Sequence, residues 1–394
     1  MYFIGKEEKE ALCRVIDAQL LIRYAGDNPK HLRMVETFEK EFAQAMGAKY
    51  ALGVTSGTAA LICCLIGCGV GPGDEVIVPG YTFIASATAV VQCKAIPVIA
   101  EIDESLNIDP KDVEKKITRH TKAIMPVHML GLPSNMDAIM KIARKHKLMV
   151  VEDCCQADGG RYRGRRLGTW GHMGGYSLNY YKIITTGEGG ALVTSDYERY
   201  QRAAIYHDQG LPYRGLTQTI PYFAGSNFRM NEFLGALALT QLHRMDGFIR
   251  PMNKFKRQIT RAIEDIKGVK ASPVNDPEGD CGTTMCLLAP NVETAKRFSA
   301  ALSRNGVGNG SPINSGRHVY RHWEYILSKS SASKDGCPWT CPHYKGKVEY
   351  SVDMCPKTLD ILARTVTFGI SPFWKPADVK KRIEAIKAAA KEVA

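Results

Sequence analysis

A single lysine, Lys182, stands among apolar, hydroxyl and glycine residues in the stretch SLNYYKIITTGEGG. A lysine in an apolar pocket has a lowered pKa, and its neutral amine attacks carbonyl groups. The alternative is a lysine at a strand end whose ammonium group reaches solvent along an apolar surface. Lys182 therefore predicts carbonyl chemistry only if neighbouring groups support it.

Two other segments contain groups that would complement such a lysine. In VVEDCCQADGG, Asp153 follows an apolar strand at its carboxyl end, where the ligands of open α/β sheets bind. In TSGTAAL, a turn of small residues precedes a helix, so the N–H groups of Gly57, Thr58 and Ala59 would form an anion site suited to phosphate. A capping aspartate and a Ser or Thr N-cap would explain these segments without any ligand.

Taken together, the three groups are those that hold pyridoxal 5′-phosphate (PLP). Lys182 would form a Schiff base with the cofactor, Asp153 would keep its pyridine nitrogen protonated, and the turn at Gly57 would anchor its phosphate. The combination predicts a PLP-dependent enzyme.

The elements that must position these groups alternate from about residue 50. Short apolar strands are predicted at YALGV, DEVIVPG, AIPVIAEID, KAIMPVHML and LMVVEDC. Helices are predicted between them at GTAALICCLIGCG, TFIASATAVVQC and NMDAIMKIARKHK. Buried strands that alternate with helices predict a doubly wound α/β sheet.

Two domains are expected. Residues 1–250 would form a large PLP-binding domain with an N-terminal helical segment, and residues 251–394 a smaller C-terminal α+β domain. Pro251, in a long helical stretch, is expected to mark a kink or the boundary.

Composition narrows the classes of protein. The chain has 394 residues and a net charge of +12, from 52 basic and 40 acidic residues. The densest basic run, RYRGRRLG, is expected to be a hairpin with its arginines in solvent rather than a nucleic-acid site. No run is long and apolar enough for a membrane span, and the N-terminus does not resemble a signal peptide. The twelve cysteines are expected to be reduced thiols of a cytoplasmic protein.

The motifs also resemble those of a known family. VEDCCQADGGRYRGRRLGTWGHMGGYSLNYYKIITTGEGGALVTSD, TSGTAAL, GPGDEVIVPGYTFIASA, PVHMLG and GSNFRMNEFLGALALTQL occur in the order typical of the DegT/DnrJ/EryC1/StrS family. These proteins are PLP-dependent aminotransferases of keto sugars and keto cyclitols. The resemblance implies fold type I of the PLP-dependent transferases, like aspartate aminotransferase, with a mixed, mostly parallel sheet in the large domain.

The resemblance also implies residue roles. Lys182 would be the internal aldimine lysine and the proton shuttle, Asp153 would pair with the pyridine nitrogen, and Gln156 would bond the cofactor's O3′. The other implied contacts are Gly57, Thr58 and Ser177 with the phosphate, Phe83 stacked on the ring, and Asn227 with the phosphate of a partner subunit's cofactor. The protein would then be a homodimer with shared active sites.

The implied reaction moves an amino group from L-glutamate or L-glutamine to a keto sugar or keto cyclitol, with pyridoxamine 5′-phosphate as intermediate. It would serve the biosynthesis of an amino sugar or aminocyclitol. One alternative is a pyridoxamine-phosphate-dependent sugar dehydratase, although those relatives replace the lysine at position 182 with histidine. Another is a non-catalytic scaffold that binds PLP or a metal. No nucleic acid or membrane partner is expected.

Other residues depart from the family pattern or lack a role. His172 stands where aspartate is common and is expected to be structural, and Asp158 stands where histidine or an apolar residue is common. His318 and His322 are candidate substrate contacts, expected on one face of a helix.

A cysteine-rich stretch near residue 340 raises the question of a metal. It holds Cys337, Cys341, His343 and Cys355, but their spacing lacks the closely spaced pairs of most zinc sites. No metal is therefore expected.

Overall fold

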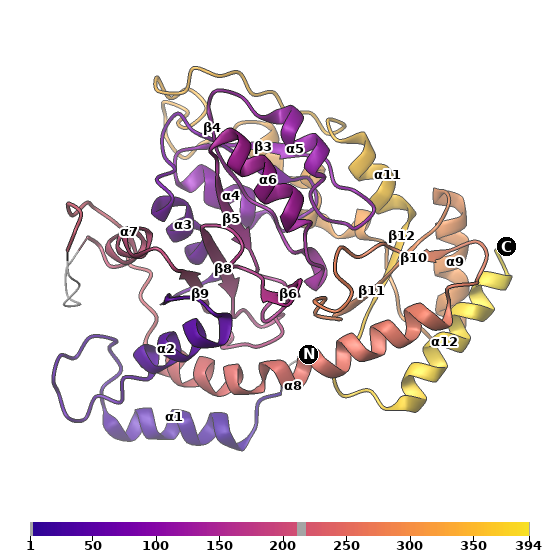
Figure 1. Cartoon of the computed structure of the whole chain (residues 1–394), viewed down its shortest axis with the longest axis horizontal. Helices are drawn as coiled ribbons and strands as arrows, with labels where there is room; N and C mark the ends of the chain where they lie inside the picture. The colour runs from indigo at the N-terminus through magenta and orange to yellow at the C-terminus, as the bar shows by residue number, and fades with distance from the viewer. Residues whose placement is uncertain (1–2, 211–217, 394) are drawn as a thin grey trace.

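The large sheet is mixed and mostly parallel. The computed structural model describes residues 3–210 and 218–393, and Figure 1 shows its arrangement. Seven strands lie in the order β1-β9-β8-β5-β4-β2-β3, and β9 runs antiparallel to both of its neighbours. The strands are β1 (Tyr50–Val54), β2 (Glu75–Pro79), β3 (Ile96–Ala100), β4 (Thr121–Ile124), β5 (Met149–Asp153), β8 (Met173–Ser177) and β9 (Gly190–Thr194).

Helices cover both faces of this sheet, because its strands are apolar on both sides. Side chains of α3 (Gly57–Gly67), α4 (Ala85–Gln92) and α7 (Tyr197–His207) belong to the core on one face. The core on the other face includes side chains of α2 (Met34–Met46), α5 (Pro110–Lys116), α6 (Met136–His146) and α8 (Glu232–Ala262). The N-terminal α1 (Lys6–Ala18) packs along α8 (Figure 1). The predicted doubly wound α/β architecture is therefore confirmed.

The five predicted strands are all present, and those predicted at AIPVIAEID and KAIMPVHML are clearly shorter than expected. The strand predicted at KAIMPVHML ends at Ile124, and the chain then turns through a 3₁₀ segment, η1 (Met129–Gly131). Pro126 explains the early end, because proline cannot donate to a strand ladder.

A smaller three-stranded antiparallel sheet follows α8, in the order β10-β11-β12. Its strands are β10 (Lys270–Ala271), β11 (Thr284–Leu288) and β12 (Thr365–Gly369), and its helices are α9 (Val292–Arg304), α11 (Pro356–Arg364) and α12 (Pro376–Lys391). Between α9 and α11 lie η2 (Pro312–Asn314), η3 (Gly316–His318), η4 (Tyr320–His322) and α10 (Glu324–Leu327). Helix α8 continues through Pro251, so the predicted division at residue 250 falls inside a continuous helix. The division itself stays a prediction.

The basic run RYRGRRLG forms the expected hairpin, from β6 (Arg161–Tyr162) and β7 (Arg165–Arg166). The prediction that its arginines face solvent is wrong for Arg166. That side chain is buried and its guanidinium group pairs with Asp246 of α8 at 2.9 Å, which fixes the hairpin against the helix. All twelve cysteines are free thiols. Among the described helices, none has the length and apolar character to cross a bilayer.

Candidate active site

The N-terminus of α3 and the end of β8 meet in a close approach. Ser56 caps α3, and its side-chain oxygen accepts a hydrogen bond from the N–H of Ala59 at 3.1 Å. A Cβ atom added to Gly57 would lie only 2.7 Å from the Cβ of Ser177 and 3.1 Å from its hydroxyl oxygen. The helix terminus, with its positive dipole end, therefore lies directly beside the Ser177 hydroxyl, as an anion site requires.

Gly190 keeps β9 close to this turn. A Cβ atom at Gly190 would lie 2.4 Å from the carbonyl oxygen of Ser56, which is backbone and cannot swing away. Gly187, in the preceding turn, has a φ of 83°, a conformation that favours glycine. The glycines that follow Lys182 thus serve a tight turn and a close backbone contact.

We expect Gly190→Ala to destabilise the folded protein by about 2 kcal/mol or more, because the new methyl group collides with backbone. Urea unfolding monitored by circular dichroism measures the effect. Gly308→Ala is the matched control, since a Cβ atom there has no neighbour within 4 Å. Equal stability of Gly190→Ala and wild type would show that the turn can move aside.

Asp153 lies buried at the carboxyl end of β5, as predicted. One carboxylate oxygen accepts a hydrogen bond from the Ser86 hydroxyl at 2.7 Å, and the other accepts one from the Cys155 N–H at 3.0 Å. Ser86 belongs to the first turn of α4 and also lies 2.7 Å from the Thr82 hydroxyl. Sequence reasoning missed Ser86, although it lies three residues after Phe83 in the segment GPGDEVIVPGYTFIASA.

Lys182 lies in the turn between β8 and β9, where its backbone N–H donates to the carbonyl of Asn179 at 3.0 Å. Its side chain is half-buried. The Cys155 thiol is affected by the charges of both Lys182 and Asp153. Burial and then the charge of Asp153 raise the pKa of Cys155 well above its usual value, and the charge of Lys182 opposes the rise. The Cys155 sulfur is also 3.0 Å from the Cβ position of Gly57. Cys155 therefore lies next to Asp153 and the α3 terminus, within range of the charge of Lys182.

His318 reaches this region, but not from an α-helix. Its ring centroid is 5.2 Å from that of Phe83, and its carbonyl accepts a hydrogen bond from the N–H of Thr82 at 2.9 Å. Burial lowers the pKa of His318, and the charge of Lys182 lowers it further. The predicted helix with His318 and His322 on one face is wrong, because the two histidines end separate 3₁₀ turns, η3 and η4. Proximity to Phe83 and Lys182 distinguishes His318 from His322.

Gln156, Asn227 and Arg229 differ in exposure and in hydrogen-bond partners. The Gln156 side chain is half-buried, and its carbonyl oxygen accepts a hydrogen bond from the N–H of Leu130 at 3.1 Å. Asn227 is exposed, on a segment whose Phe228 carbonyl accepts from the N–H of Thr55 at 3.0 Å. Arg229, two residues further on, pairs with the buried Asp208 at 2.6 Å and so has a structural role.

Comparison with known proteins identifies the family. The model of the DegT/DnrJ/EryC1/StrS aminotransferase family matches residues 4–323.

The chain belongs to the DegT/DnrJ/EryC1/StrS aminotransferase family.

Two curated relatives illustrate the range of this family. GDP-perosamine synthase of Caulobacter vibrioides is 43% identical over 216 residues, which are 54% of this chain and 57% of that protein. L-glutamine:2-deoxy-scyllo-inosose aminotransferase of Micromonospora echinospora is 40% identical over 287 residues, 69% of this chain and 65% of that protein. The chain thus spans less than two thirds of either relative in these matches.

A crystal structure of 3-amino-5-hydroxybenzoic acid synthase superimposes with a TM-score of 0.80 at 29% identity, covering 99% of this chain and 97% of that one. The fold is therefore that of the PLP-dependent aminotransferases, fold type I, as expected. Family membership implies dependence on PLP, and the residues present fit this cofactor. The close approach of Gly57 and Ser177 suits a phosphate, and the buried Asp153 suits a pyridinium nitrogen.

His172 is structural in this member of the family. Its Nδ1 atom accepts a hydrogen bond from the N–H of Val150 at 2.9 Å, and burial lowers the pKa of its ring. The neutral ring therefore ties the segment before β8 to β5, as expected of a turn residue.

Asp158 is fully buried five residues after Asp153, and neither of its carboxyl oxygens has a hydrogen-bond partner among the described residues. Burial raises its pKa to about 8, and the charge of Asp153 adds to the rise. Lys182 and the nearby N–H groups of Asp158 and Ile183 oppose it, although neither N–H makes a well-formed hydrogen bond. At neutral pH the carboxyl group is therefore protonated.

This protonation makes stability depend on pH. The pKa of Asp158 is about 8 in the folded protein and near 3.8 when unfolded, so folding takes up a proton between these values. The stability that this group contributes is fully present at a pH below its unfolded pKa, and it is lost as the pH rises to its folded pKa. We expect Asp158→Asn to abolish this pH dependence. Between the two pKa values, the unfolding free energy of the variant minus that of wild type should rise by roughly 1.4 kcal/mol for each pH unit. Urea unfolding of both proteins at several pH values measures how the unfolding free energy depends on pH. Parallel plots for wild type and Asp158→Asn would contradict the prediction.

A second buried cluster consists of His128, Glu152 and Cys154, whose ligand-type atoms all lie within 4.8 Å of one another. Hydrogen bonds already satisfy its polar groups. His128 Nδ1 accepts from the N–H of Ser134, Nε2 lies 3.1 Å from Glu152, and Glu152 accepts from the N–H groups of Gly168 and Gly171. The cluster therefore holds the loop after β5 in place. Sequence reasoning missed this histidine–glutamate pair.

The cysteine-rich stretch does not assemble as a group of ligands. Cys355 is buried, with its sulfur 3.9 Å from the carbonyl of Ile99. Within residues 3–210 and 218–393, His128, Glu152 and Cys154 form the only cluster of three such ligands.

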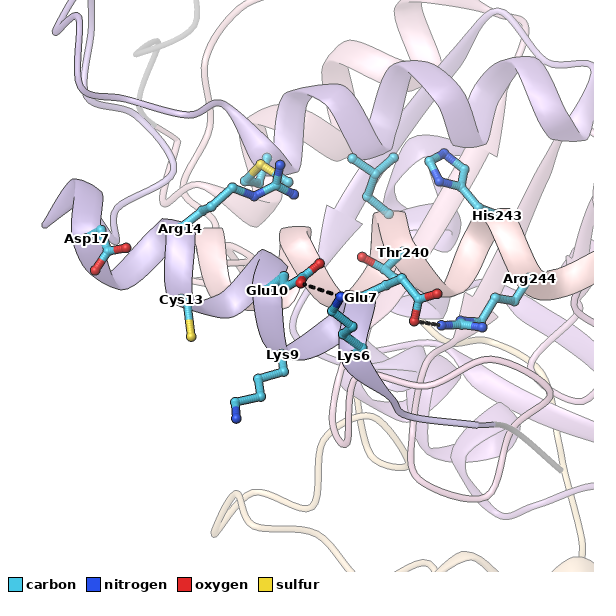
Figure 2. A pocket seen from close by; sticks show the side chains of 12 residues that line it. Lys6, Glu7, Lys9, Glu10, Cys13, Arg14, Asp17, Thr240, His243 and Arg244 are labelled. Carbon is cyan, nitrogen blue, oxygen red and sulfur yellow. Dashed lines mark hydrogen bonds and ion pairs between the residues drawn. The ribbon is translucent and has the colours of Figure 1, made fainter.

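A groove also runs between α1 and α8 (Figure 2). Its walls carry Lys6, Glu7 and Glu10 from α1 and His243 and Arg244 from α8. Arg244 pairs with Glu7 at 2.6 Å, so charges on the two helices partly neutralise one another. None of the predicted site residues lines this groove.

Proposed function

We propose that this chain is a PLP-dependent aminotransferase that moves an amino group from L-glutamate or L-glutamine to a keto sugar or keto cyclitol. One observation carries the proposal. Asp153 and the α3 terminus at Gly57 lie next to Cys155, and the charge of Lys182 acts on the same thiol, although the three groups are far apart in sequence. That is the arrangement a lysine-linked cofactor with a pyridinium ring and a phosphate requires.

In this function PLP supplies an electron-accepting ring, and pyridoxamine 5′-phosphate is its amine-carrying form between the two half-reactions. Lys182 would hold the cofactor and would move the proton at the reacting carbon. Asp153 would pair with the ring nitrogen, and hydrogen bonds from the Ser86 hydroxyl and the Cys155 N–H hold its carboxyl group in place. Gln156 would orient the ring through its O3′ atom.

The rest of the site would bind the phosphate, stack on the ring and complete a dimer. Thr58 and Ser177 would supply hydroxyl groups beside Gly57, and the half-exposed Phe83 would cover the ring. Asn227, exposed on the segment beside Thr55, would reach the phosphate in a partner subunit. We therefore propose that the protein is a homodimer, which gel filtration would test. We also propose that it resides in the cytoplasm.

The names of the relatives support the acceptor class, which spans nucleotide-linked sugars and cyclitols, and one names L-glutamine as donor. We expect His318→Ala to raise KM for the acceptor and to leave KM for the donor nearly unchanged, because His318 contacts the ring of Phe83 at the edge of the site. Steady-state kinetics with each substrate varied in turn measures both. His322→Ala is the matched comparison, and an equal effect of both changes would remove the special role of His318.

The first experiment is an absorbance spectrum of the purified protein before and after addition of L-glutamate or L-glutamine. We expect a visible cofactor band that is replaced by the near-ultraviolet band of the amine form. A band that neither donor changes would contradict these donors. Absence of the visible band would favour a pyridoxamine-phosphate-dependent sugar dehydratase, and bound PLP without turnover of any donor would favour a non-catalytic scaffold.

A further inference from the structure

A cleft lined mainly by basic side chains lies between the β6–β7 hairpin and the second half of α8. Its volume is about 730 Å³, and residues of the loop before β11 complete its wall. Clefts of this volume are typical of sites for small molecules. None of the residues with a proposed cofactor or substrate role lines it, so a ligand here would be additional to the proposed reaction.

Contacts between distant segments fix the walls of this cleft. The ion pair of Arg166 with Asp246, described above, holds the hairpin against α8. The backbone N–H of Arg161 donates to the carbonyl of Gly279 at 2.8 Å, which joins the hairpin to the loop before β11. A Cβ atom at Gly279 would lie only 2.0 Å from the carbonyl oxygen of Arg161, so the two backbones are in close contact. The cleft is therefore preformed, and a ligand would bind without first ordering it.

Helix α8 contributes a stripe of basic side chains to the cleft. Arg250, Lys254, Arg257 and Arg261 all line it. Their spacing of i, i+4, i+7 and i+11 places them on one face of the helix, over about 16 Å at 1.5 Å per residue. Arg161 adds another cation from the hairpin. Such spacing is also common on solvated helix faces, so the neighbouring acidic residues decide whether these charges are compensated.

The acidic residues of the cleft do not neutralise the stripe. Three of them line it, and each already has a cation as its partner. These pairs are Asp246 with Arg166 at 2.9 Å, Asp280 with Lys256 at 2.5 Å and Glu278 with Arg257 at 3.3 Å. Four cations of the cleft have no ion pair among the described residues, namely Arg161, Arg250, Lys254 and Arg261. Positive charges that face a shared concave space repel one another, and a bound anion would relieve this repulsion.

We propose that this cleft binds a polyphosphate chain, either inorganic or carried by a nucleotide. A single carboxylate would leave most of the four charges uncompensated, whereas a linear polyphosphate carries several negative charges and can extend along the stripe. Arginine suits phosphate because its planar guanidinium group donates two parallel hydrogen bonds to the oxygens. No aromatic side chain lines the cleft, so it lacks the stacking surface of sites for single-stranded nucleic acid.

Isothermal titration calorimetry of the full-length protein, with its cofactor retained, tests the proposal. The probes are inorganic tripolyphosphate and ATP. Wild type is expected to bind at least one of them in a 1:1 complex, with an affinity that falls as the salt concentration rises. Equal binding of both probes would identify the phosphate chain as the recognised group, and tighter binding of ATP would add contacts to the nucleoside. The absence of binding by both probes would overturn the proposal.

The variant Arg250→Gln with Lys254→Gln is expected to bind tripolyphosphate at least about tenfold more weakly, because two charge-assisted contacts are lost. Both side chains are exposed and have no ion pair among the described residues, so the fold should be unaffected, and circular dichroism checks it. The matched control is Lys141→Gln with Arg144→Gln on α6, which removes the same two charges from another exposed helix face. Equal weakening in the two variants would indicate an effect of net charge and would overturn the site.

Protection of Lys254 from acetylation locates the anion independently. Acetic anhydride labelling, read by mass spectrometry, is compared with and without tripolyphosphate. Lys254 is expected to be protected and Lys141 to be labelled equally in both samples. Protection of Lys182 in place of Lys254 would assign the anion to the candidate active site and overturn the proposal. A single-stranded DNA oligonucleotide that binds and that tripolyphosphate cannot displace would also overturn it, in favour of a nucleic-acid surface.

Discussion

Lys182→Ala is expected to abolish amino transfer, with a loss of roughly 10³-fold or more in kcat, because one amine both holds the cofactor and moves the proton. The visible absorbance of the lysine-linked cofactor should disappear as well. The fold should survive, since Lys182 is half-buried and its backbone N–H, which bonds Asn179, is unchanged by the substitution.

Single-turnover kinetics with the amino donor measures the loss, and circular dichroism checks the fold. Lys141→Ala, at an exposed lysine on α6, is the matched control and should keep full activity. Full activity of Lys182→Ala would exclude the proposed role of this lysine. Partial recovery with an added small amine would support it, because a free base could then replace the missing side chain.

Asp153→Asn is expected to keep the cofactor and to lose turnover by about 10²-fold to 10³-fold, because the fixed negative charge facing the ring nitrogen is removed. The structure explains why the fold should tolerate the change. The Ser86 hydroxyl can turn to accept a hydrogen bond from the new amide, since it already lies 2.7 Å from the Thr82 hydroxyl. The Cys155 N–H can still donate to the remaining oxygen.

The measurement is kcat for the donor half-reaction, with the cofactor content of the same sample determined by absorbance. Asp265→Asn, at an exposed aspartate after α8, is the matched control. An unchanged rate in Asp153→Asn would mean that another group faces the ring nitrogen. Loss of the cofactor together with the rate would assign Asp153 to binding rather than to chemistry.

The sequence by itself predicted the class of fold and the three groups at the centre of the site. Local signals sufficed for this, because short apolar strands alternate with helices and Asp153 directly follows such a strand. The structure adds that β5 and β8 are adjacent parallel strands, so Asp153 and Ser177 lie at the same edge of the sheet.

Contacts between distant segments were decided only by the tertiary structure. The partner of Asp153, Ser86, comes from a helix 67 residues away in sequence, and no local pattern specifies such a distance. His318 reaches Phe83 because an extended pairing of Tyr81 with Val319 brings its 3₁₀ turn to the site, where helical spacing had suggested a surface helix. Arg166 is buried because Asp246 of α8 lies opposite it.

Asp158 shows most clearly which properties the sequence predicts and which only the tertiary structure decides. Its identity and its position after β5 are evident from the sequence, and so is its departure from the family pattern. The complete burial of its side chain, the lack of a well-formed hydrogen bond to its oxygens and the influence of the Lys182 charge arise only when separate segments pack together. A carboxyl group is acidic or nearly neutral according to its surroundings, and those exist only once the chain has folded.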